Sequence, residues 1–173
     1  MTFGDGLIEI FGQPVVLNPL LTEIGILKAL EKKKLENVIY YSAKDAGLEW
    51  FKNMTSKYGL KPQDIMKWGP DLINLAGWGT VKPIKADISS SSLDFYLLNS
   101  TLAKNYGKSD RPVDHYFRGL VTGAWENACK ESLAGVEIEC LSMGAKACRF
   151  QVRPITFFAK GTDLVKNQLL PTV

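Results

Sequence analysis

Hydrophobic and polar positions follow two different periods along the chain, which predicts a mixture of strands and helices. In several short stretches, apolar residues alternate with polar ones or form a brief unbroken run, as in strands. Longer stretches repeat apolar residues every three or four positions, as on one face of a helix. The predicted strands are 7–11, 13–17, 37–42, 80–86, 93–100 and two within the hairpin 136–152. The predicted helices are 19–34, 43–58, 62–76 with a break at Gly69-Pro70, and 113–130.

Turn and cap residues support these boundaries. Asn18 and Pro19 suit the N-cap and the first position of a helix. Gly59 suits a helix end, and Gly12 suits the turn that joins the first two strands. The chain thus alternates strands and helices without internal repeats, as in an α/β or α+β fold.

Two glycines, Gly119 and Gly123, lie inside the predicted helix 113–130. Each costs about 1 kcal/mol relative to alanine in a helix interior. Their spacing of four places both on one face. We therefore expect this helix to approach another helix or a strand closely; the alternative is room for a ligand beside the backbone.

The predicted hairpin contains two of the three cysteines, placed symmetrically about Gly144. A turn at this glycine would set Cys140 opposite Cys148 and pair Glu139 with Arg149, two opposite charges. The same register gives the pairs Val136 with Val152, Ile138 with Phe150 and Glu137 with Gln151. One face of the hairpin is then apolar and the other polar, as in a half-buried antiparallel sheet.

Two facing cysteines allow three kinds of chemistry. Directly opposed residues have Cα atoms about 4.5–5.5 Å apart, which suits a disulfide or two thiolates on one metal ion. Cys140 and Cys148 could equally be small buried core residues. Glu137 is a nearby carboxylate for a tetrahedral zinc site, but on a regular strand it points away from Cys140. Both reach one ion only if the strand bulges or ends near Cys140.

The composition indicates one ordinary globular unit: 173 residues, 46% hydrophobic and 23% charged. We expect one domain over 1–154 and a C-terminal tail over 155–173 that adds a short helix or frays. No run of 18 apolar residues and no signal-peptide pattern occurs, so we expect no membrane span and a cytoplasmic location. The net charge of +3 is too small to indicate a nucleic-acid partner.

Gly77-Trp78-Gly79 sets a tryptophan between two glycines, so tertiary contacts must hold its side chain. Trp78 could simply cap the core. With three other tryptophans, six tyrosines and eight phenylalanines, the chain also has the material for an apolar pocket. The candidate ligand-binding residues are Trp78, Phe117 and Trp125.

Several motifs occur in a fixed order along the chain: Gly77-Trp78-Gly79, Arg111-Pro-Val-Asp114, Gly119-x-x-x-Gly123, Glu137-x-x-Cys140, Gly144 and Cys148-x-Phe150. This set resembles the 4-vinyl-reductase domain family. The resemblance implies an antiparallel sheet packed with helices, related to trafficking-complex subunits and haem nitric-oxide sensors. It also implies a homodimer and the binding of a small hydrophobic or aromatic molecule, as in aromatic-responsive bacterial regulators.

The resemblance further implies a structural zinc site. In those sensors, Glu and Cys residues matching Glu137, Cys140 and Cys148 hold the ion. Their fourth ligand is a cysteine after Pro-Val, where this chain has Asp114, followed by its only histidine, His115. A carboxylate and a neutral imidazole both bind zinc, although the loss of one thiolate weakens a soft site. Asp114 and His115 are therefore both candidate fourth ligands.

A ligand-binding or sensory domain is the function that these expectations favour. A protein-interaction subunit of the trafficking-complex type is the alternative. A reductase or accessory enzyme of tetrapyrrole metabolism ranks third, because the sequence has no catalytic-triad order, phosphate loop or dinucleotide-binding glycine motif. A zinc ion with four protein ligands would also be structural rather than catalytic.

Overall fold

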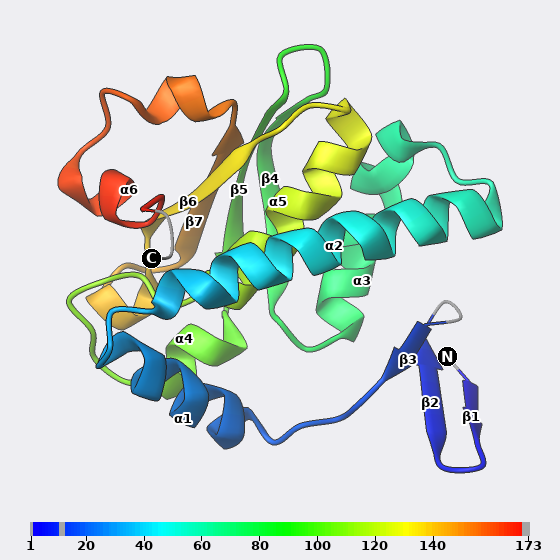
Figure 1. The fold of residues 1–173 in the computed structure, drawn as a ribbon, viewed down its shortest axis with the longest axis horizontal. Coiled ribbons are helices and arrows are strands. Elements are labelled where there is room, and N and C mark those ends of the chain that lie inside the picture. Colours follow the sequence, from blue (N-terminus) through cyan, green and yellow to red (C-terminus); the bar gives the residue numbers. More distant parts are fainter. Residues whose placement is uncertain (1, 11–12, 171–173) are drawn as a thin grey trace.

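The computed structural model describes residues 2–10 and 13–170. Within them, a four-stranded antiparallel sheet has the strand order β4-β5-β7-β6. Helix α5 lies against one face of this sheet, and the long helix α2 crosses over α5 (Figure 1). A second sheet of order β1-β2-β3 lies at the N-terminus. The expected architecture, an antiparallel sheet packed with helices, is confirmed.

The described strands are β1 Thr2–Gly4, β2 Leu7–Ile10, β3 Gln13–Val15, β4 Thr80–Asp87, β5 Ser92–Leu98, β6 Ala134–Glu139 and β7 Cys148–Arg153. The described α-helices are α1 Leu20–Glu31, α2 Glu36–Tyr58, α3 Ile65–Leu75, α4 Thr101–Tyr106, α5 His115–Cys129 and α6 Asp163–Asn167. Short 3₁₀ turns cover Pro62–Asp64, Leu141–Met143 and Ile155–Phe158. No helix in the described part of the chain is long and apolar enough to span a membrane.

The hydrophobic core forms between α5 and the inner face of the four-stranded sheet. Its central side chains are at most 2% exposed: Phe95, Leu97, Phe117, Trp125 and Phe150. The rings of Phe95 and Phe150, on neighbouring strands, stack with centroids 5.1 Å apart. This core holds α5 in place on the sheet.

Residues 37–42, predicted as a strand, form the first turns of α2. The prediction rested on the β-branched and aromatic residues of this stretch. The buried positions of α2 are Tyr40, Ala43, Gly47, Phe51 and Met54, three or four residues apart. This helical spacing runs through the stretch without a break, so packing against α5 overrides the local strand preference.

Gly119 and Gly123 bring α5 into backbone contact with α2, as the close-approach prediction required. A Cβ added at Gly119 would lie 2.3 Å from the carbonyl oxygen of Tyr40, and one at Gly123 would lie 2.0 Å from that of Lys44. On the other helix, a Cβ at Gly47 would lie 2.5 Å from the α5 backbone. The two helices can cross at this distance because all three positions lack a side chain.

The strands β6 and β7 form the predicted hairpin, but most of the predicted register is wrong. Glu139 pairs with Arg149 as expected. Farther from the turn, the observed pairs are Gly135 with Val152, Val136 with Gln151 and Glu137 with Phe150. The expected pairs Val136–Val152, Ile138–Phe150 and Glu137–Gln151 do not form.

A bulge between Glu137 and Glu139 causes this displacement. It leaves Ile138 without a partner in the ladder and bends the strand. The strand β6 also ends at Glu139, just before Cys140. A bulge or a strand end was the condition under which Glu137 and Cys140 could reach one ion, and both are present.

The helix α3 runs through Pro70 without a break, so the predicted interruption at Gly69-Pro70 is wrong. A proline restricts the preceding residue because its ring collides with the Cβ of that residue. Gly69 has no Cβ, which removes this part of the conflict. The apolar face of α3 is therefore continuous.

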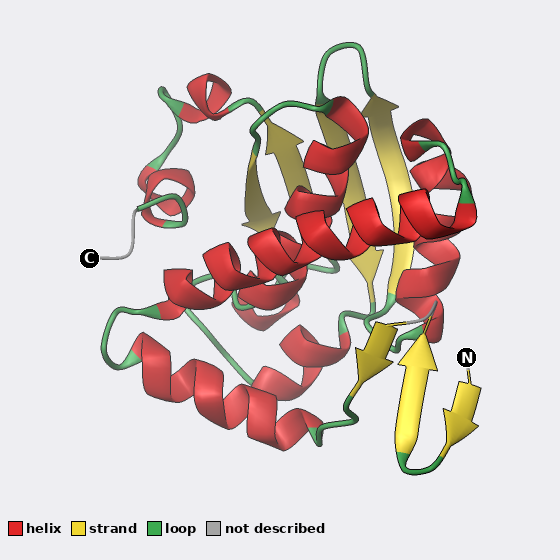
Figure 2. Cartoon of the chain, turned by 45° about the vertical axis from the view of Figure 1, so that its right-hand side comes forward, coloured by secondary structure: helices red, strands yellow, loops and turns green. Residues whose placement is uncertain are grey.

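At the N-terminus, the two predicted strands are present as β2 and β3 and pair with each other. The predicted strand end at Phe11 and the turn at Gly12 lie outside the described residues. The helix α1 begins at Leu20 with Pro19 at its N-cap, so the N-cap predicted at Asn18 is wrong by one residue. The N-terminal sheet projects from the main body at the end of the extended residues 16–19 (Figure 2).

The C-terminal segment 155–170 packs on the free edge of β6. The side chain of Gln168 accepts a hydrogen bond from the backbone N–H of Glu137 and donates one to its carbonyl, both at 2.9 Å. The guanidinium of Arg118 donates to the carbonyl oxygens of Gln168 and Gly135. The segment thus covers the sheet edge at which a further strand could pair. The division of the chain at residue 154 stays a prediction.

Candidate functional site

A concave apolar cavity of about 100 Å³ lies between α3, α5 and the strands β4 and β5, and α2 contributes to its wall. Its lining residues are Trp50, Phe51, Ile65, Met66, Gly69, Pro70, Leu72, Ile73, Ala76, Trp78, Val81, Leu93, Phe95, Leu120, Val121, Ala124 and Trp125. None of these side chains carries a charge. A space of this kind suits a small hydrophobic molecule.

The two faces of α5 serve different purposes. Ala124 and Trp125 follow Val121 by three and four residues, so all three lie on one face of the helix and line the cavity. Gly119 and Gly123 lie on the opposite face, against α2. The position of α5 relative to α2 therefore sets one wall of the cavity.

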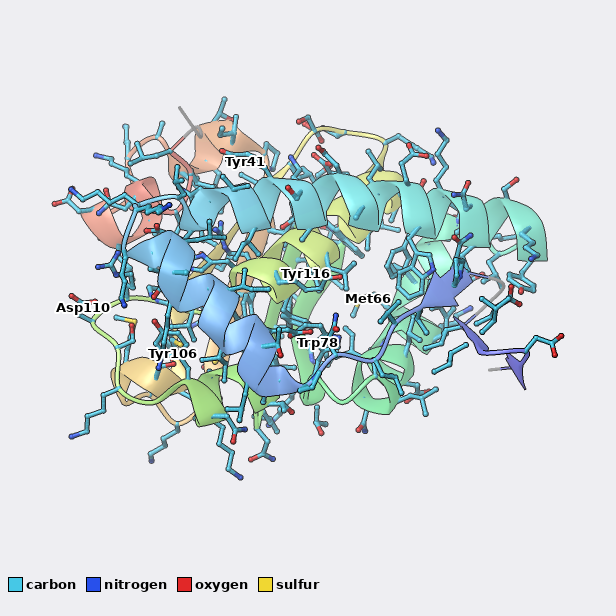
Figure 3. All side chains as sticks on the ribbon, turned by 60° about the horizontal axis from the view of Figure 1, so that its bottom comes forward. Tyr41, Met66, Trp78, Tyr106, Asp110 and Tyr116 are labelled. Carbon is cyan, nitrogen blue, oxygen red and sulfur yellow. The ribbon has the colours of Figure 1, made fainter. Side chains whose placement is uncertain are left out.

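Trp78 lies on the loop between α3 and β4 and forms part of the cavity wall. The neighbouring Gly77 and Gly79 have φ angles of +80° and +139°, which side chains disfavour. The indole of Trp78 stacks on the ring of Tyr116, with centroids 5.3 Å apart (Figure 3). Because Tyr116 is 43% exposed, this stack joins the cavity wall to the molecular surface.

The three candidate ligand-binding residues take different places. Trp78 and Trp125 both line the cavity. Trp125 is 1% exposed, and its indole N–H has no hydrogen-bond partner among the described residues. Phe117 packs behind the wall, with its ring centroid 5.8 Å from that of Trp78 and 5.3 Å from that of Phe150. Phe117 thus supports the wall and is not part of it.

A second cluster of functional groups lies where β6, β7 and the start of α5 meet. The ligand atoms of Glu137, Cys140 and Cys148 all lie within 4.8 Å of one another, and all three residues are buried. The two sulfur atoms are 4.0 Å apart and are free thiols, because a disulfide would need about 2.05 Å. The predicted facing of the two cysteines is present. We call these three residues the thiol–carboxylate cluster.

Asp114 and His115, the candidate fourth ligands, lie in different surroundings. The backbone N–H of Asp114 donates to Glu137 Oε2 at 3.1 Å, and the pKa of its carboxyl group responds to both cysteines. His115 instead faces Arg118, with 3.4 Å between Nδ1 and the guanidinium Nη2. Asp114 therefore adjoins the thiol–carboxylate cluster, whereas the described ring contact of His115 is with Arg118.

The buried environment redistributes protons within this cluster. Burial raises the pKa of Glu137 well above its ordinary value, and the charges of Asp114 and Cys140 add to the effect. Burial also raises the pKa of Asp114 to about 7. A hydrogen bond from Cys148 lowers the pKa of Cys140 to about 5, and the same bond raises the pKa of Cys148. Of the two thiols, Cys140 is therefore the one that loses its proton more readily.

The donor set and its spacing fit a zinc ion. Two thiolates on a tetrahedral zinc lie about 3.8 Å apart, given Zn–S bonds of about 2.3 Å; the observed separation is 4.0 Å. Glu137 Oε1 is buried and has no hydrogen-bond partner among the described residues, so a cation would satisfy it. Glu137, Cys140 and Cys148 would hold the ion, and Asp114 is the adjoining carboxylate. Such an ion would act as a structural cross-link.

Sequence reasoning missed most of the cavity wall and one supporting residue of the cluster. Ile65, Met66 and Ile73 of α3 could have been found from the one-sided apolar face of that helix. Ser100, whose hydroxyl donates to both carboxylate oxygens of Asp114 at 2.9 Å, could not. It lies 14 residues before Asp114, and no local pattern marks that contact.

Among solved structures, the chain is similar to the phenol-responsive sensory domain of the transcription activator PoxR with phenol, at 19% identity and a TM-score of 0.77. This likeness covers 98% of this chain and 92% of that chain. A vinyl-4-reductase family protein from Methanocaldococcus jannaschii shares 18% identity, with a TM-score of 0.54 and coverage of 80% of this chain and 83% of that one.

A trafficking protein particle complex subunit 3 from Naegleria fowleri, covalently bound to palmitic acid, shares 13% identity with a TM-score of 0.52. It covers 78% of this chain and 92% of that chain. The expected relation to the trafficking-complex fold is thereby confirmed, and at these identities the likeness concerns the fold. No curated protein matches the chain.

The family model of the 4-vinyl-reductase domain matches residues 95–154. This range holds most of β5, all of α5 and the β6–β7 hairpin, and with them the thiol–carboxylate cluster and one wall of the cavity. The motifs from Asp114 to Phe150 on which the resemblance was based fall within it. Over residues 95–154 the chain therefore matches the 4-vinyl-reductase domain family, as the sequence motifs predicted.

Proposed function

We propose that this chain is a small-molecule binding and sensory domain, whose apolar cavity takes a hydrophobic or aromatic ligand. The observation that carries the proposal is the cavity itself, whose wall has no charged side chain. Its volume of about 100 Å³ is near that of an engineered apolar cavity of about 150 Å³ that binds benzene. The space therefore fits a molecule with about one aromatic ring. The phenol named with the PoxR sensory domain is a molecule of this size.

The position of α5 suggests how a bound ligand would be sensed. One face of this helix lines the cavity, and its N-terminal end adjoins the thiol–carboxylate cluster. The cluster, whether as thiols or with a metal, braces the hairpin against the start of the helix. A ligand that shifts α5 would therefore also strain this junction.

Ligand binding can be tested by measuring the melting temperature with single-ring aromatic and aliphatic compounds. A ligand at ten times its Kd should stabilise the protein by about 1.4 kcal/mol, or about 3–6 °C. Ala124→Leu, which adds volume to the cavity wall, should abolish the shift. Ala86→Leu, on an exposed position of β4 outside the cavity, should retain it. No shift with any compound would refute the proposal and favour an interaction subunit.

The second part of the proposal is a structural zinc ion in the thiol–carboxylate cluster. Elemental analysis of the purified protein should then give about one zinc per chain. Cys140→Ser should remove most of the metal, whereas Cys129→Ser, a cysteine outside the cluster, should leave it unchanged. Equal zinc contents in the two variants would contradict a site at Cys140.

The third part is a homodimer, which the N-terminal region supports. Val16, Leu17 and Leu21 are 82%, 74% and 78% exposed, close to the projecting three-stranded sheet. A small isolated sheet and exposed apolar side chains both gain stability when another surface covers them. Light scattering should give twice the mass of one chain, and Leu17→Glu with Leu21→Glu should halve it. Ile84→Glu, a matched exposed position on β4, should not.

A further inference from the structure

The end of the described chain is held by side chains of α2 and α5. The carbonyl oxygens of residues 167–170 each accept a hydrogen bond of 3.1 Å. The donors are Asn37, which bonds to the first and the last of the four, Tyr41 and Arg118. A small apolar patch adds to this attachment, because side chains of the segment 155–170 pack on those of β6. Detaching such a segment costs less free energy than unfolding the core.

Helix α6 is stable only while this segment is attached. It has five residues, far fewer than the ~12–15 that an isolated helix needs in water. Four backbone amides bond to carbonyl oxygens within 162–166: those of Val165, Lys166, Gln168 and Leu169. Exchange of these amide hydrogens with solvent therefore reports whether the segment is attached.

The attachment meets the thiol–carboxylate cluster at Glu137. The side chain of Gln168 bonds to both the backbone N–H and the carbonyl of this residue, each at 2.9 Å. The carboxylate of the same residue belongs to the cluster. An ion held by that carboxylate would therefore also fix the backbone unit to which Gln168 binds.

Arg118 connects the segment to the cluster by charge. Its side chain is 2% exposed and bonds to two carbonyl oxygens and the His115 ring. None of the ion pairs among the described residues includes it, and Glu137 is the acid whose charge acts on it. Two thiolates and a carboxylate on one zinc ion give a net negative charge, the counter-charge that a buried cation needs. Because Arg118 donates to the carbonyl of Gln168, an occupied cluster would favour the attached segment.

We infer that the segment 155–170 is a metal-dependent latch: it stays docked on β6 when the thiol–carboxylate cluster holds an ion and detaches readily when the cluster is empty. This inference rests on the proposed zinc site. Detachment would uncover the backbone edge of β6 at Glu137 and the apolar side chains of Ala134 and Val136. Metal occupancy would thus control the exposure of this edge of the sheet.

Hydrogen exchange followed by mass spectrometry tests the latch in the wild-type protein. Exchange is compared between zinc-loaded protein and protein whose zinc a chelator has removed, at a temperature where circular dichroism shows both forms folded. The peptide that contains α6 should exchange about tenfold faster without zinc, an ordinary strength of coupling between two sites. Peptides from α3, which packs beside β4 at the opposite edge of the sheet, should exchange equally in both forms.

The possible failures of this experiment differ from one another. Equal exchange of α6 in the two forms would overturn the latch and leave the zinc site intact. Equal acceleration of α6 and α3 would also overturn it, because the effect would then be a general loss of stability. If the protein takes up no zinc, the proposed zinc site is refuted and the latch with it.

The coupling must also work in reverse, because two linked sites change each other's affinity by the same factor. Competition with a chromogenic chelator measures the zinc affinity of three variants. Gln168→Ala should weaken zinc binding by about tenfold. Asn37→Ala, which loosens the segment from α2 and lies outside the cluster, should weaken it by about threefold. Lys166→Ala, an exposed position on α6, should leave it within about twofold. Weakening in Gln168→Ala alone would show that Gln168 merely positions Glu137, and the latch would be overturned.

Discussion

Replacing Gly123 with alanine should destabilise the protein, although alanine is the better helix former. The new Cβ would lie 2.0 Å from the carbonyl oxygen of Lys44 and 2.6 Å from the backbone nitrogen of Leu48. Both obstacles are backbone atoms of α2, so no side-chain rotation can relieve them. Overpacking of this kind costs about 3 kcal/mol or slightly more, and the gain in helix propensity returns about 1 kcal/mol. The net loss should be about 2 kcal/mol.

The same substitution at Gly25 is a matched control with the opposite expected sign. Gly25 lies inside α1, and a Cβ there would meet nothing within 4 Å. Gly25→Ala should therefore stabilise the protein by about 0.5–1 kcal/mol. Urea unfolding followed by circular dichroism measures both free energies. If Gly123→Ala proved as stable as the wild type, the close crossing of α2 and α5 would be refuted.

Two further predictions concern the four-stranded sheet. Gln168→Ala should speed hydrogen exchange at the amide of Glu137, because it removes both hydrogen bonds that cover this backbone unit; unchanged exchange would show that the C-terminal segment does not protect the edge. Burial raises the pKa of Asp94, but hydrogen bonds from Arg149 and Gln151 outweigh it, so the net pKa lies below 3.8. A lowered pKa in the folded state stabilises above about pH 4, and this contribution is lost as the pH falls through the lowered value. Unfolding curves between pH 5 and pH 2.5 should therefore show a smaller loss of stability for Asp94→Asn than for the wild type, and equal losses would contradict the assignment.

The elements with a clear pattern of their own could be predicted from the sequence. Gly59 ends α2 in the left-handed conformation, as its position predicted. Residues 37–42 were mistaken for a strand because their local preference is for β structure, whereas Tyr40 is placed by its contact with the α5 backbone. That contact joins residues about 80 positions apart, and no local rule includes it.

The candidate site, too, could be predicted only in part from the sequence. The symmetry of Cys140 and Cys148 about Gly144 predicted that they face each other, because a hairpin turn is a local event. A bulge brings Glu137 to the same cluster. The sequence showed that a bulge or a strand end was needed for this, but its position could not be predicted. Apart from Trp78 and Trp125, most of the cavity wall was not predicted, because it combines side chains from α2, α3, α5 and two strands.

The interlocking of α2 and α5 through three glycines divides the cavity into a stiff half and a compliant half. Sliding either helix by one residue would press a side chain into the backbone of the other, so the pair can only move as one body. A ligand larger than the space provided would then be accommodated mainly by the opposite wall, which consists of α3 and the Trp78 loop, while any shift of α5 would carry α2 with it. Adaptation to ligands of different size would thus be concentrated in residues 65–79, and sequence changes there would alter selectivity at little expense to the fold.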